Sequence, residues 1–547
     1  MRSVFVSLIL LISSPAVSQN AEDVVAGRQA DLLQLRTEIK TTHPNPFANI
    51  GEDAWEAAFM DVESRLGRMT RNEFGVALQQ LVALLGDAHT SVNPQLDRVL
   101  SSRRYPMELY LFEDGLHVRA AAPEYADLVG GRVVQIGEAD PGRAISSVAE
   151  TISNENTWWI RAMAPERLVI PEVLDGLGIT GIADSLAVIV EKEGVRHSAV
   201  VDPVTIPQVE HHGHGTALDK SDWLDMRESA EKPLWLEHPN DPMWHTWLED
   251  SSTLYVCYRA VISPDSGPSN HEFWEEIFGE ADRRNPKRVV IDIRENSGGN
   301  GMLNRNVIQQ IMRRPDLDRP DRLFVIIGRR TFSAGQQLAN QLDWWTQATF
   351  AGEPTGQRVS QYGDAVRVEL AHSGISVFIS TRFHQAPNPL DTRDFIPPDV
   401  YAPVTSEDYR KGADAAFSAI LSNEERESAM SRVVGALQAG QFDLAERHLG
   451  NANLDPANRY RDFEADVNAI GYDLLGRGQV DAAIAVFEIN TRVYPGSANA
   501  FDSLGEALVA AGRHQEAIDA YRQAINIDPG LPSSLRALRK LESRGGY

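Results

Sequence analysis

Apolar residues recur with a helical period near the start of the chain. Residues 30–39 (ADLLQLRTEI) and 74–85 (FGVALQQLVALL) place apolar side chains every three to four positions, which is the spacing of an amphipathic helix. Gly86 follows the second run directly, in the position where glycine commonly ends a helix. The pattern predicts a helical N-terminal unit over residues 19–105.

A different period begins near residue 106. Short alternating or β-branched apolar runs follow one another between Gly, Pro and Asp turns, at residues 109–112, 116–119, 132–136 and 186–190. These runs predict a small β-rich module over residues 106–202. Residues 203–245, which contain several prolines and the histidines His211, His212 and His214, are predicted to be a linker.

In the next segment, residues 246–422, strand-like apolar runs alternate with helical patterns. Residues 289–293, 323–327 and 348–351 have the continuous apolar character of buried strands, with amphipathic helical patterns at 302–313 and 334–345 between them. Alternating strands follow at 366–370 and 375–381. This strand–helix–strand order predicts an α/β layer with crossover connections.

The C-terminal quarter repeats itself. The residues Gly471, Gly478, Ala483, Phe487 and Pro495 recur 34 positions later as Gly505, Gly512, Ala517, Tyr521 and Pro529. This period, with small residues where two helices touch, is typical of tetratricopeptide repeats. The pattern predicts an array of α-helical repeats over residues 423–547, capped by a degenerate unit at 436–449, since two repeats alone bury little surface.

The N-terminal sequence indicates where the protein is located, and the composition indicates which partners it can bind. Residues 1–18 combine a basic start, an apolar run too short to span a bilayer and a small-residue end, which predicts a cleaved signal peptide. With 52 Lys and Arg against 77 Asp and Glu, the net charge of −25 disfavours nucleic-acid partners. Cys257 is the single cysteine and excludes an intrachain disulfide. We expect a periplasmic or secreted protein with no membrane span after cleavage.

Ser333 is the first candidate for chemistry. It follows the apolar run 323–328 through a short turn, and the helical pattern begins at Ala334. A hydroxyl at such a junction lies beside the unpaired N–H groups of a helix start, which suits oxyanion chemistry. Gly298 and Gly299, after the preceding strand, allow the backbone to approach a ligand closely.

A serine nucleophile needs a base. The chain has no lysine between Ser333 and Lys411, so a lysine base within the same α/β unit is absent. His89 lies just beyond the helix stop at Gly86, in a loop from which it could reach another domain. A lone serine after a strand is usually a helix cap, and a lone histidine there is usually structural, so the assignment depends on the combination.

The combination resembles the S41 family of tail-specific, C-terminal-processing serine peptidases. The motifs that carry the resemblance occur in the family's order, at residues 85–90 (LGDAHT), 291–299 (IDIRENSGG), 331–335 (TFSAG), 352–356 (GEPTG) and 398–400 (PDV). The resemblance spans roughly residues 25–420 and leans toward the tricorn-core branch, which uses a histidine base. Gln357 stands where the other branch has its lysine.

The resemblance implies a fold and a set of roles. The fold would be a β-β-α spiral core like that of ClpP and crotonase, with residues 106–202 as a PDZ-like module that grips the substrate. Ser333 would be the nucleophile and His89 the general base, with Gly298 or Gly299 and Ala334 as oxyanion donors. The acid that orients the histidine stays open between Asp394 and Asp391, with Asp364 a further candidate.

These implications predict an exported serine endopeptidase that acts on peptide or protein substrates without a cofactor or metal. His211, His212 and His214 have weak ligand spacing and are expected to be a solvated loop. Two alternatives remain. One is a catalytically inactive peptide-binding scaffold that recruits a protein partner through the groove of its repeats; the other is a hydrolase of esters or amides that are not proteins.

Overall fold

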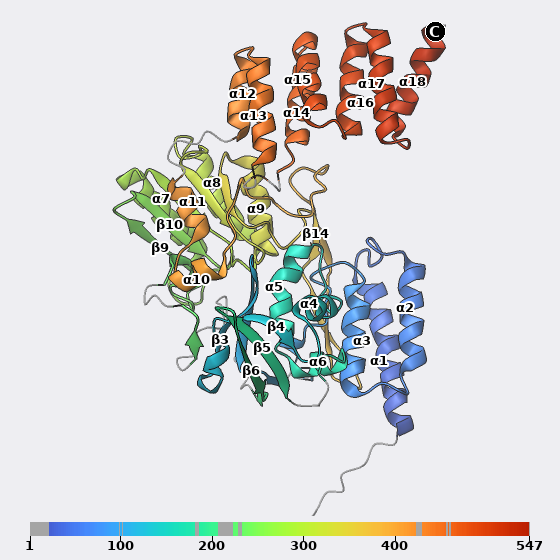
Figure 1. The fold of residues 1–547 in the computed structure, drawn as a ribbon, viewed down its shortest axis with the longest axis vertical. Helices are drawn as coiled ribbons and strands as arrows, with labels where there is room; N and C mark the ends of the chain where they lie inside the picture. The colour runs from blue at the N-terminus through green and yellow to red at the C-terminus, as the bar shows by residue number, and fades with distance from the viewer. Residues whose placement is uncertain are drawn as a thin grey trace, which may run out of the picture.

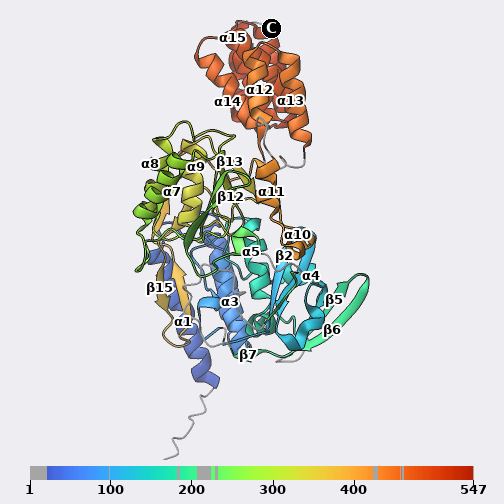
Figure 2. The ribbon, with the colours of Figure 1, turned by 90° about the vertical axis from the view of Figure 1, so that its left-hand side faces the viewer.

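The structure is a computed structural model that describes residues 21–545, apart from 98, 101, 181–184, 206–222, 228–231, 423–428, 456–457 and 459–460. The predicted signal peptide at 1–18 and the three histidines His211, His212 and His214 lie outside the described residues. Figures 1 and 2 show an elongated molecule, with the C-terminal helices at one end, the N-terminal helices and the middle module at the other, and the α/β core between them. Within the described ranges, we find no helix with the length and apolar character needed to cross a membrane.

The chain begins with three helices, where a helical unit was predicted. They are α1 (Ala21–Thr42), α2 (Glu52–Arg65) and α3 (Arg71–Ala83). Thr70 and Glu73 form a capping box at the start of α3, which satisfies two backbone N–H groups of the first turn. The loop after α3 carries His89.

A hairpin from the second half of the sequence completes the N-terminal unit. Its strands β15 (Val366–Glu369) and β16 (Ser376–Ile379) pair antiparallel. They were predicted as part of the α/β layer, but their apolar residues Val377 and Ile379 are buried in one cluster with Leu78 of α3. Burial of this alternating apolar face against the helices therefore decides where the hairpin lies. It also places β16 beside the His89 loop, because Ser91 and Phe378 exchange two backbone hydrogen bonds of 2.9 Å.

The middle module contains an antiparallel sheet in the strand order β2-β3-β4-β5-β6. The strands are β2 (Met107–Phe112), β3 (Gly115–Ala121), β4 (Arg132–Ile136), β5 (Leu186–Lys192) and β6 (Val195–Val201), with β8 (Leu224–Asp225) beside β3. Helices α4 (Pro141–Ala149), α5 (Thr157–Arg167) and α6 (Pro171–Gly176) lie between β4 and β5 in sequence.

The three helices were missed in the expectation of a β-rich module, although their start signals are present. Asp140 caps α4 before Pro141, and the Asn156 side chain accepts hydrogen bonds from Trp158 and Trp159 at the start of α5. The likeness of this module to a PDZ domain stays a prediction.

The α/β core is built on a six-stranded sheet in the order β18-β13-β12-β11-β10-β9, in which only the β9–β10 pair is antiparallel. Its strands are β9 (Met243–Leu248), β10 (Thr253–Tyr258), β11 (Arg288–Asp292), β12 (Leu323–Ile327), β13 (Thr349–Gly352) and β18 (Val400–Tyr401). The predicted mixture of helix with a largely parallel sheet is therefore observed, whereas the spiral arrangement stays a prediction.

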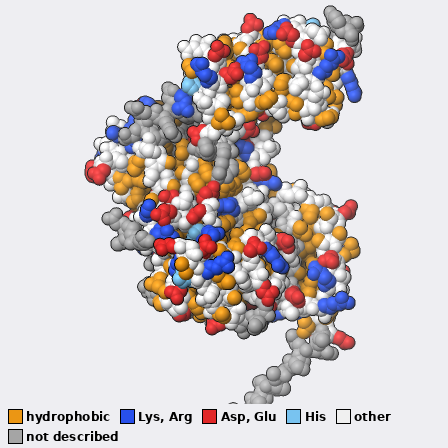
Figure 3. Space-filling model, in the orientation of Figure 1, with side chains coloured by type: hydrophobic (Ala, Val, Ile, Leu, Met, Phe, Trp, Pro, Cys, Tyr) orange, Lys and Arg blue, Asp and Glu red, His pale blue; other side chains and the backbone are white. Residues whose placement is uncertain are grey.

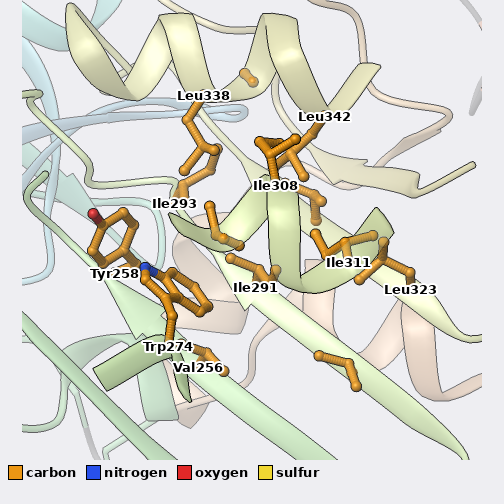
Figure 4. Close-up of a cluster of buried hydrophobic side chains, with 14 of the residues drawn as sticks. Val256, Tyr258, Trp274, Ile291, Ile293, Ile308, Ile311, Leu323, Leu338 and Leu342 are labelled. Atoms are coloured by element: carbon orange, nitrogen blue, oxygen red, sulfur yellow. The ribbon is translucent and has the colours of Figure 1, made fainter. Parts of the chain in front are cut away.

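Helices cover both faces of this sheet. On one face lie α7 (Asn270–Arg284), α8 (Asn304–Met312) and α9 (Ala334–Trp345), whose apolar residues pack on Val256 and Ile291 as Figure 4 shows. On the other face, α11 (Ala415–Ser422) packs on β10 to β13, after the short helix α10 (Ser406–Lys411). Because β11 and β12 are parallel neighbours, the loops that follow them meet at one edge of the sheet.

The remaining short elements connect these units. Two small antiparallel pairs are formed by β1 (Arg103–Arg104) with β7 (Val204–Thr205), and by β14 (Gln361–Gly363) with β17 (Arg382–His384). Single turns of 3-10 helix occur at Pro94–Leu96, Leu234–Leu236 and Gly301–Leu303, and a longer one at Pro123–Leu128.

The C-terminal array consists of antiparallel helix pairs. Its helices are α12 (Ala429–Gln438), α13 (Phe442–Leu454), α14 (Phe463–Gly476), α15 (Val480–Val493), α16 (Ala498–Ala510), α17 (His514–Ile527) and α18 (Pro532–Gly545). An ion pair between Arg461 and Asp399 links the array to the core, and Asp399 also accepts the Phe350 N–H at 2.7 Å.

The repeated small residues stand where helices touch. A methyl group on Gly505 would lie 2.6 Å from the Tyr521 ring, and one on Gly471 would lie 2.4 Å from the Phe487 ring. We expect Gly505→Ala to lower the free energy of unfolding by about 1–3 kcal/mol, the usual effect of overpacking. Gly476→Ala is the matched control, because its methyl meets no atom within 4 Å. Equal thermal unfolding midpoints of the two variants would contradict this account of the repeat.

Candidate active site

Ser333 lies in a sharp turn between β12 and α9. The Gly335 N–H donates to the Phe332 carbonyl at 2.9 Å, which closes a turn with Ser333 at its first central position. Ser333 has φ 54° and ψ −124°, a conformation that favours glycine there. Its side chain makes no capping hydrogen bond to α9. The structural role usual for a serine before a helix is therefore absent, and the backbone is strained at this residue.

Contacts with the loop after β11 hold this turn in place. The Phe332 N–H donates to the Asn296 carbonyl at 2.9 Å, and the Thr331 hydroxyl donates to the Ile293 carbonyl at 2.8 Å. A side chain at Gly335 would lie 2.5 Å from the Asn296 carbonyl oxygen. Glycine at 335 is thus required for the two loops to approach each other.

The backbone strain at residue 333 predicts a difference in stability between two variants. Ser333→Gly and Ser333→Ala both remove the hydroxyl, but only glycine relieves the left-handed φ. Because such strain is worth on the order of 1–3 kcal/mol, less the greater chain entropy of glycine, we expect Ser333→Gly to be more stable than Ser333→Ala by about 1 kcal/mol. Chemical denaturation of both variants measures the difference. A glycine variant less stable than the alanine variant would show that the turn is not strained.

The His89 imidazole reaches Ser333 across 244 positions of sequence. Its Nε2 lies 3.0 Å from the Ser333 Oγ. The ring also stacks on Phe332, with 4.5 Å between centroids, and Phe332 stacks in turn on Trp159 at 4.2 Å. The two candidates that sequence analysis placed in different units are thus within hydrogen-bonding distance.

The buried carboxylate of Asp87 organises the His89 loop. It accepts the backbone N–H of His89 at 3.0 Å and that of Thr90 at 3.2 Å. The Ser380 hydroxyl, from the hairpin region, donates to it at 2.7 Å, and His43 Nε2 lies 3.1 Å away. Burial disfavours the charged form, but the hydrogen bond with His43 and the charge of His89 hold the pKa of Asp87 below its ordinary value.

Gln357 connects Ser333 to His89. Its Oε1 accepts the Ser333 backbone N–H at 2.7 Å, and its Nε2 lies 3.0 Å from His89 Nδ1. The same Nε2 lies 3.4 Å from Oε1 of Glu155, and the Arg358 N–H donates to the other oxygen of Glu155 at 3.0 Å. Gln357 is completely buried.

Two further pKa values near the site are shifted, those of His89 and Glu155. Burial lowers the pKa of His89, and the carboxylate of Asp87 opposes this only in part, as do Asp364 and the Tyr362 carbonyl. Burial and the nearby Asp87 raise the pKa of Glu155 to about 8, despite hydrogen bonds from Arg358, Gln357 and Ala88. The imidazole is therefore neutral at neutral pH, which a general base must be.

The Gly298 backbone lies close to the Ser333 hydroxyl and to the Ala334 nitrogen. A side chain on Gly298 would lie 3.0 Å from Ser333 Oγ and 2.9 Å from the Ala334 nitrogen, so only glycine fits there. The Gly298 N–H, one predicted oxyanion donor, donates instead to Asn296 Oδ1 at 2.9 Å. For the N–H groups of Gly299 and Ala334, the part of the chain that the structure describes offers no hydrogen-bond acceptor. These two remain as candidate donors.

The predicted acids lie elsewhere. Asp394 accepts a hydrogen bond of 2.8 Å from Arg358, and Asp391 binds Arg393 at 2.7 Å. Neither makes a hydrogen bond or ion pair with His89 among the described residues. Asp364 lies 3.7 Å from His384 and acts on His89 only through its charge. The structure thus does not bring a predicted acid to Nδ1 of His89.

The residues beside Nδ1 were not assigned a role from sequence. Gln357 was noted only as the replacement of a lysine, and Glu155 was not singled out. Glu155 directly precedes Asn156, the cap of α5, but a carboxylate before a helix is common and carries no functional signal by itself. Among the described residues, no group of three or more His, Cys, Asp or Glu side chains is arranged to hold a metal ion.

Comparison with known proteins identifies the repeats and the fold. Residues 468–532 match the tetratricopeptide repeat family, which confirms the predicted repeats. Mature CPAF complexed with lactacystin has a TM-score of 0.52 at 12% identity, covering 76% of this chain and 99% of that chain. A CPAF mutant has a TM-score of 0.54 at 11% identity, covering 74% and 99%.

A third solved structure, the photosystem II D1 C-terminal processing protease, has a TM-score of 0.32 at 16% identity, covering 72% and 98% of the two chains. No curated protein matches the chain. The chain therefore shares the fold of CPAF over about three quarters of its length, with tetratricopeptide repeats at its C-terminal end.

Proposed function

We propose that this chain, with the fold of CPAF, is a serine endopeptidase of the tail-specific type. The observation that carries the proposal is the 3.0 Å distance from His89 Nε2 to Ser333 Oγ. A serine whose only purpose was structural would cap α9 in a relaxed conformation, whereas Ser333 is strained and does not cap it. The hydroxyl, the imidazole and the unpaired backbone N–H groups together suit acyl transfer.

In the proposed mechanism, His89 Nε2 takes the proton of Ser333 as the Oγ attacks the carbonyl carbon of a peptide bond. The negative charge that develops on the carbonyl oxygen is stabilised by the N–H groups of Gly299 and Ala334. The imidazolium then gives its proton to the leaving amine. Water, activated by the same imidazole, releases the acyl group and regenerates Ser333.

The proposed function includes export of the protein and binding of polypeptide partners. The character of residues 1–18 supports export to the periplasm or secretion. Figure 3 shows the surface hollowed between the C-terminal helices and the N-terminal half of the molecule. The helical repeats offer a surface for a protein partner.

Labelling with a fluorophosphonate, which reacts with activated serines, tests the assignment directly. We expect one label on Ser333 of the full chain, loss of the label in His89→Ala and retention in Ser297→Ala, the other serine of the two loops at the sheet edge. Labelling that survives His89→Ala would overturn the role of His89. A chain that takes no label would favour the inactive scaffold that binds peptides.

A positive label leaves two hydrolase classes to be separated. A set of unstructured peptides with free and amidated C-termini, assayed beside simple esters, distinguishes them. Cleavage of peptides with a preference for a free C-terminus supports a tail-specific peptidase. Turnover of esters alone would refute the peptidase assignment and retain the serine hydrolase.

A further inference from the structure

The hydrogen bonds of Gln357 decide which nitrogen of His89 carries the proton. The Ser333 backbone N–H is always a donor, so the atom of Gln357 that faces it at 2.7 Å must be the carbonyl oxygen Oε1. The amide NH₂ group then faces His89 Nδ1 at 3.0 Å. Because an NH₂ group can only donate, Nδ1 must accept, and the proton of the neutral ring must be on Nε2.

This tautomer is the wrong one for a general base. With its proton on Nε2, the ring donates to the Ser333 Oγ and has no lone pair there to accept the serine proton. Moreover, the imidazolium formed during catalysis carries a second proton on Nδ1, which would then point at the donor group of Gln357. In a serine triad this position is held by a carboxylate, which accepts that proton.

We propose that Gln357 is a positioning residue that holds the resting site in the non-catalytic tautomer of His89. The inference rests on the proposed function of Ser333 and His89. Catalysis requires the Gln357 amide to turn, so that its oxygen faces Nδ1, and this turn breaks the hydrogen bond from the Ser333 N–H.

The surroundings of Gln357 reinforce its orientation. Glu155 Oε1 lies 3.4 Å from Nε2 and accepts from the same NH₂ group, so the amide is held from both ends. A turned amide would place its NH₂ against the Ser333 N–H, two donors facing each other. Complete burial keeps water from relieving either mismatch.

The substitution Gln357→Glu removes the conflict at Ser333 and His89. The neighbouring Glu155, whose pKa burial raises to about 8, is protonated at neutral pH and can donate to the new carboxylate. One carboxylate oxygen accepts the Ser333 N–H and the other accepts a proton on Nδ1, so both donors are satisfied in a side chain of nearly the same shape. A serine triad with an amide in place of its acid loses about 10⁴-fold in kcat through the wrong tautomer. We therefore expect Gln357→Glu to raise kcat/KM of the full chain by about 10² to 10⁴-fold.

The matched control is Gln347→Glu, the same exchange on an exposed residue, which should change kcat/KM by less than about two-fold. A folded Gln357→Glu variant that is no more active than the unaltered chain would overturn the proposal. So would a control that gains as much activity as Gln357→Glu.

Nitrogen-15 NMR of histidine-labelled protein measures the tautomer without any assay of activity, with the His89 signals assigned by their loss in His89→Ala. In the unaltered chain we expect a bare Nδ1 and a protonated Nε2, and in Gln357→Glu a protonated Nδ1. A protonated Nδ1 in the unaltered chain would refute the inference even if the glutamate variant failed to fold. If Ser333→Ala retained full activity, the proposed function would fail while the tautomer result would stand.

Discussion

Replacement of Ser333 by alanine is expected to lower kcat for peptide hydrolysis by about 10² to 10⁴-fold, less than the loss of about 10⁶-fold in a complete serine triad, because Gln357 already holds His89 in the non-catalytic tautomer. The fold should survive the change. Alanine retains the Cβ, no capping bond is lost, and the hydrogen bond to His89 contributes only about 0.5–1.5 kcal/mol. The proposed oxyanion donors are unaffected by this substitution, so a residual rate above that of water is expected.

Steady-state kinetics with a peptide substrate, together with thermal unfolding, measure both effects. A variant with unchanged unfolding and turnover reduced by several orders of magnitude supports the nucleophile assignment. Peptide cleavage at the rate of the unaltered chain would refute it. Equal losses of activity and of folded structure would mean that Ser333 is structural, contrary to the absence of a capping bond.

Removal of the base should cost nearly as much as removal of the nucleophile. We expect His89→Ala to lower kcat by about 10² to 10⁴-fold, and the double variant with Ser333→Ala to be no slower than either single variant. The reason is that the two groups act as one unit through the 3.0 Å contact, so once one of them is lost, loss of the other has no further effect.

His384→Ala is the matched control for this second prediction. His384 acts on His89 only through its charge, and it makes no hydrogen bond to Ser333 within the described parts of the chain. We expect less than a ten-fold change in kcat. Additive losses in the double variant, or a loss in His384→Ala as large as that in His89→Ala, would contradict the assignment of His89 as the base.

The acid predicted to orient His89 shows where an inference from a sequence motif failed. Asp394 and Asp391 were predicted because they lie where the tricorn-core branch of the S41 family has its acid, but their carboxylates are paired with Arg358 and Arg393. The position beside Nδ1 is filled by Gln357, which arrives from the loop after β13, with Glu155 behind it from the middle module. No local sequence pattern predicts that the Gln357 loop and the middle module contact each other at His89.

The hairpin of β15 and β16 is a second example. Its alternation of apolar residues was enough to predict two strands, but not which surface they would cover. They bury Val377 and Ile379 against the N-terminal helices, and through Ser91 they hold the loop that carries His89. The approach of His89 to Ser333 therefore depends on the long-range packing of this hairpin against the N-terminal helices.

Periodicity and turn residues, read locally, established the N-terminal helices, the strands and helices of the α/β core, the turn at Ser333 and the repeats with their spacing of 34 residues. These features depend on short-range backbone preferences and on which faces must be buried. The partners of His89, the choice between Gly298 and Gly299, and the tautomer that Gln357 imposes were decided only in three dimensions. They depend on hydrogen bonds between groups up to 268 positions apart, whose pairing is set by the packing of separate units against one another.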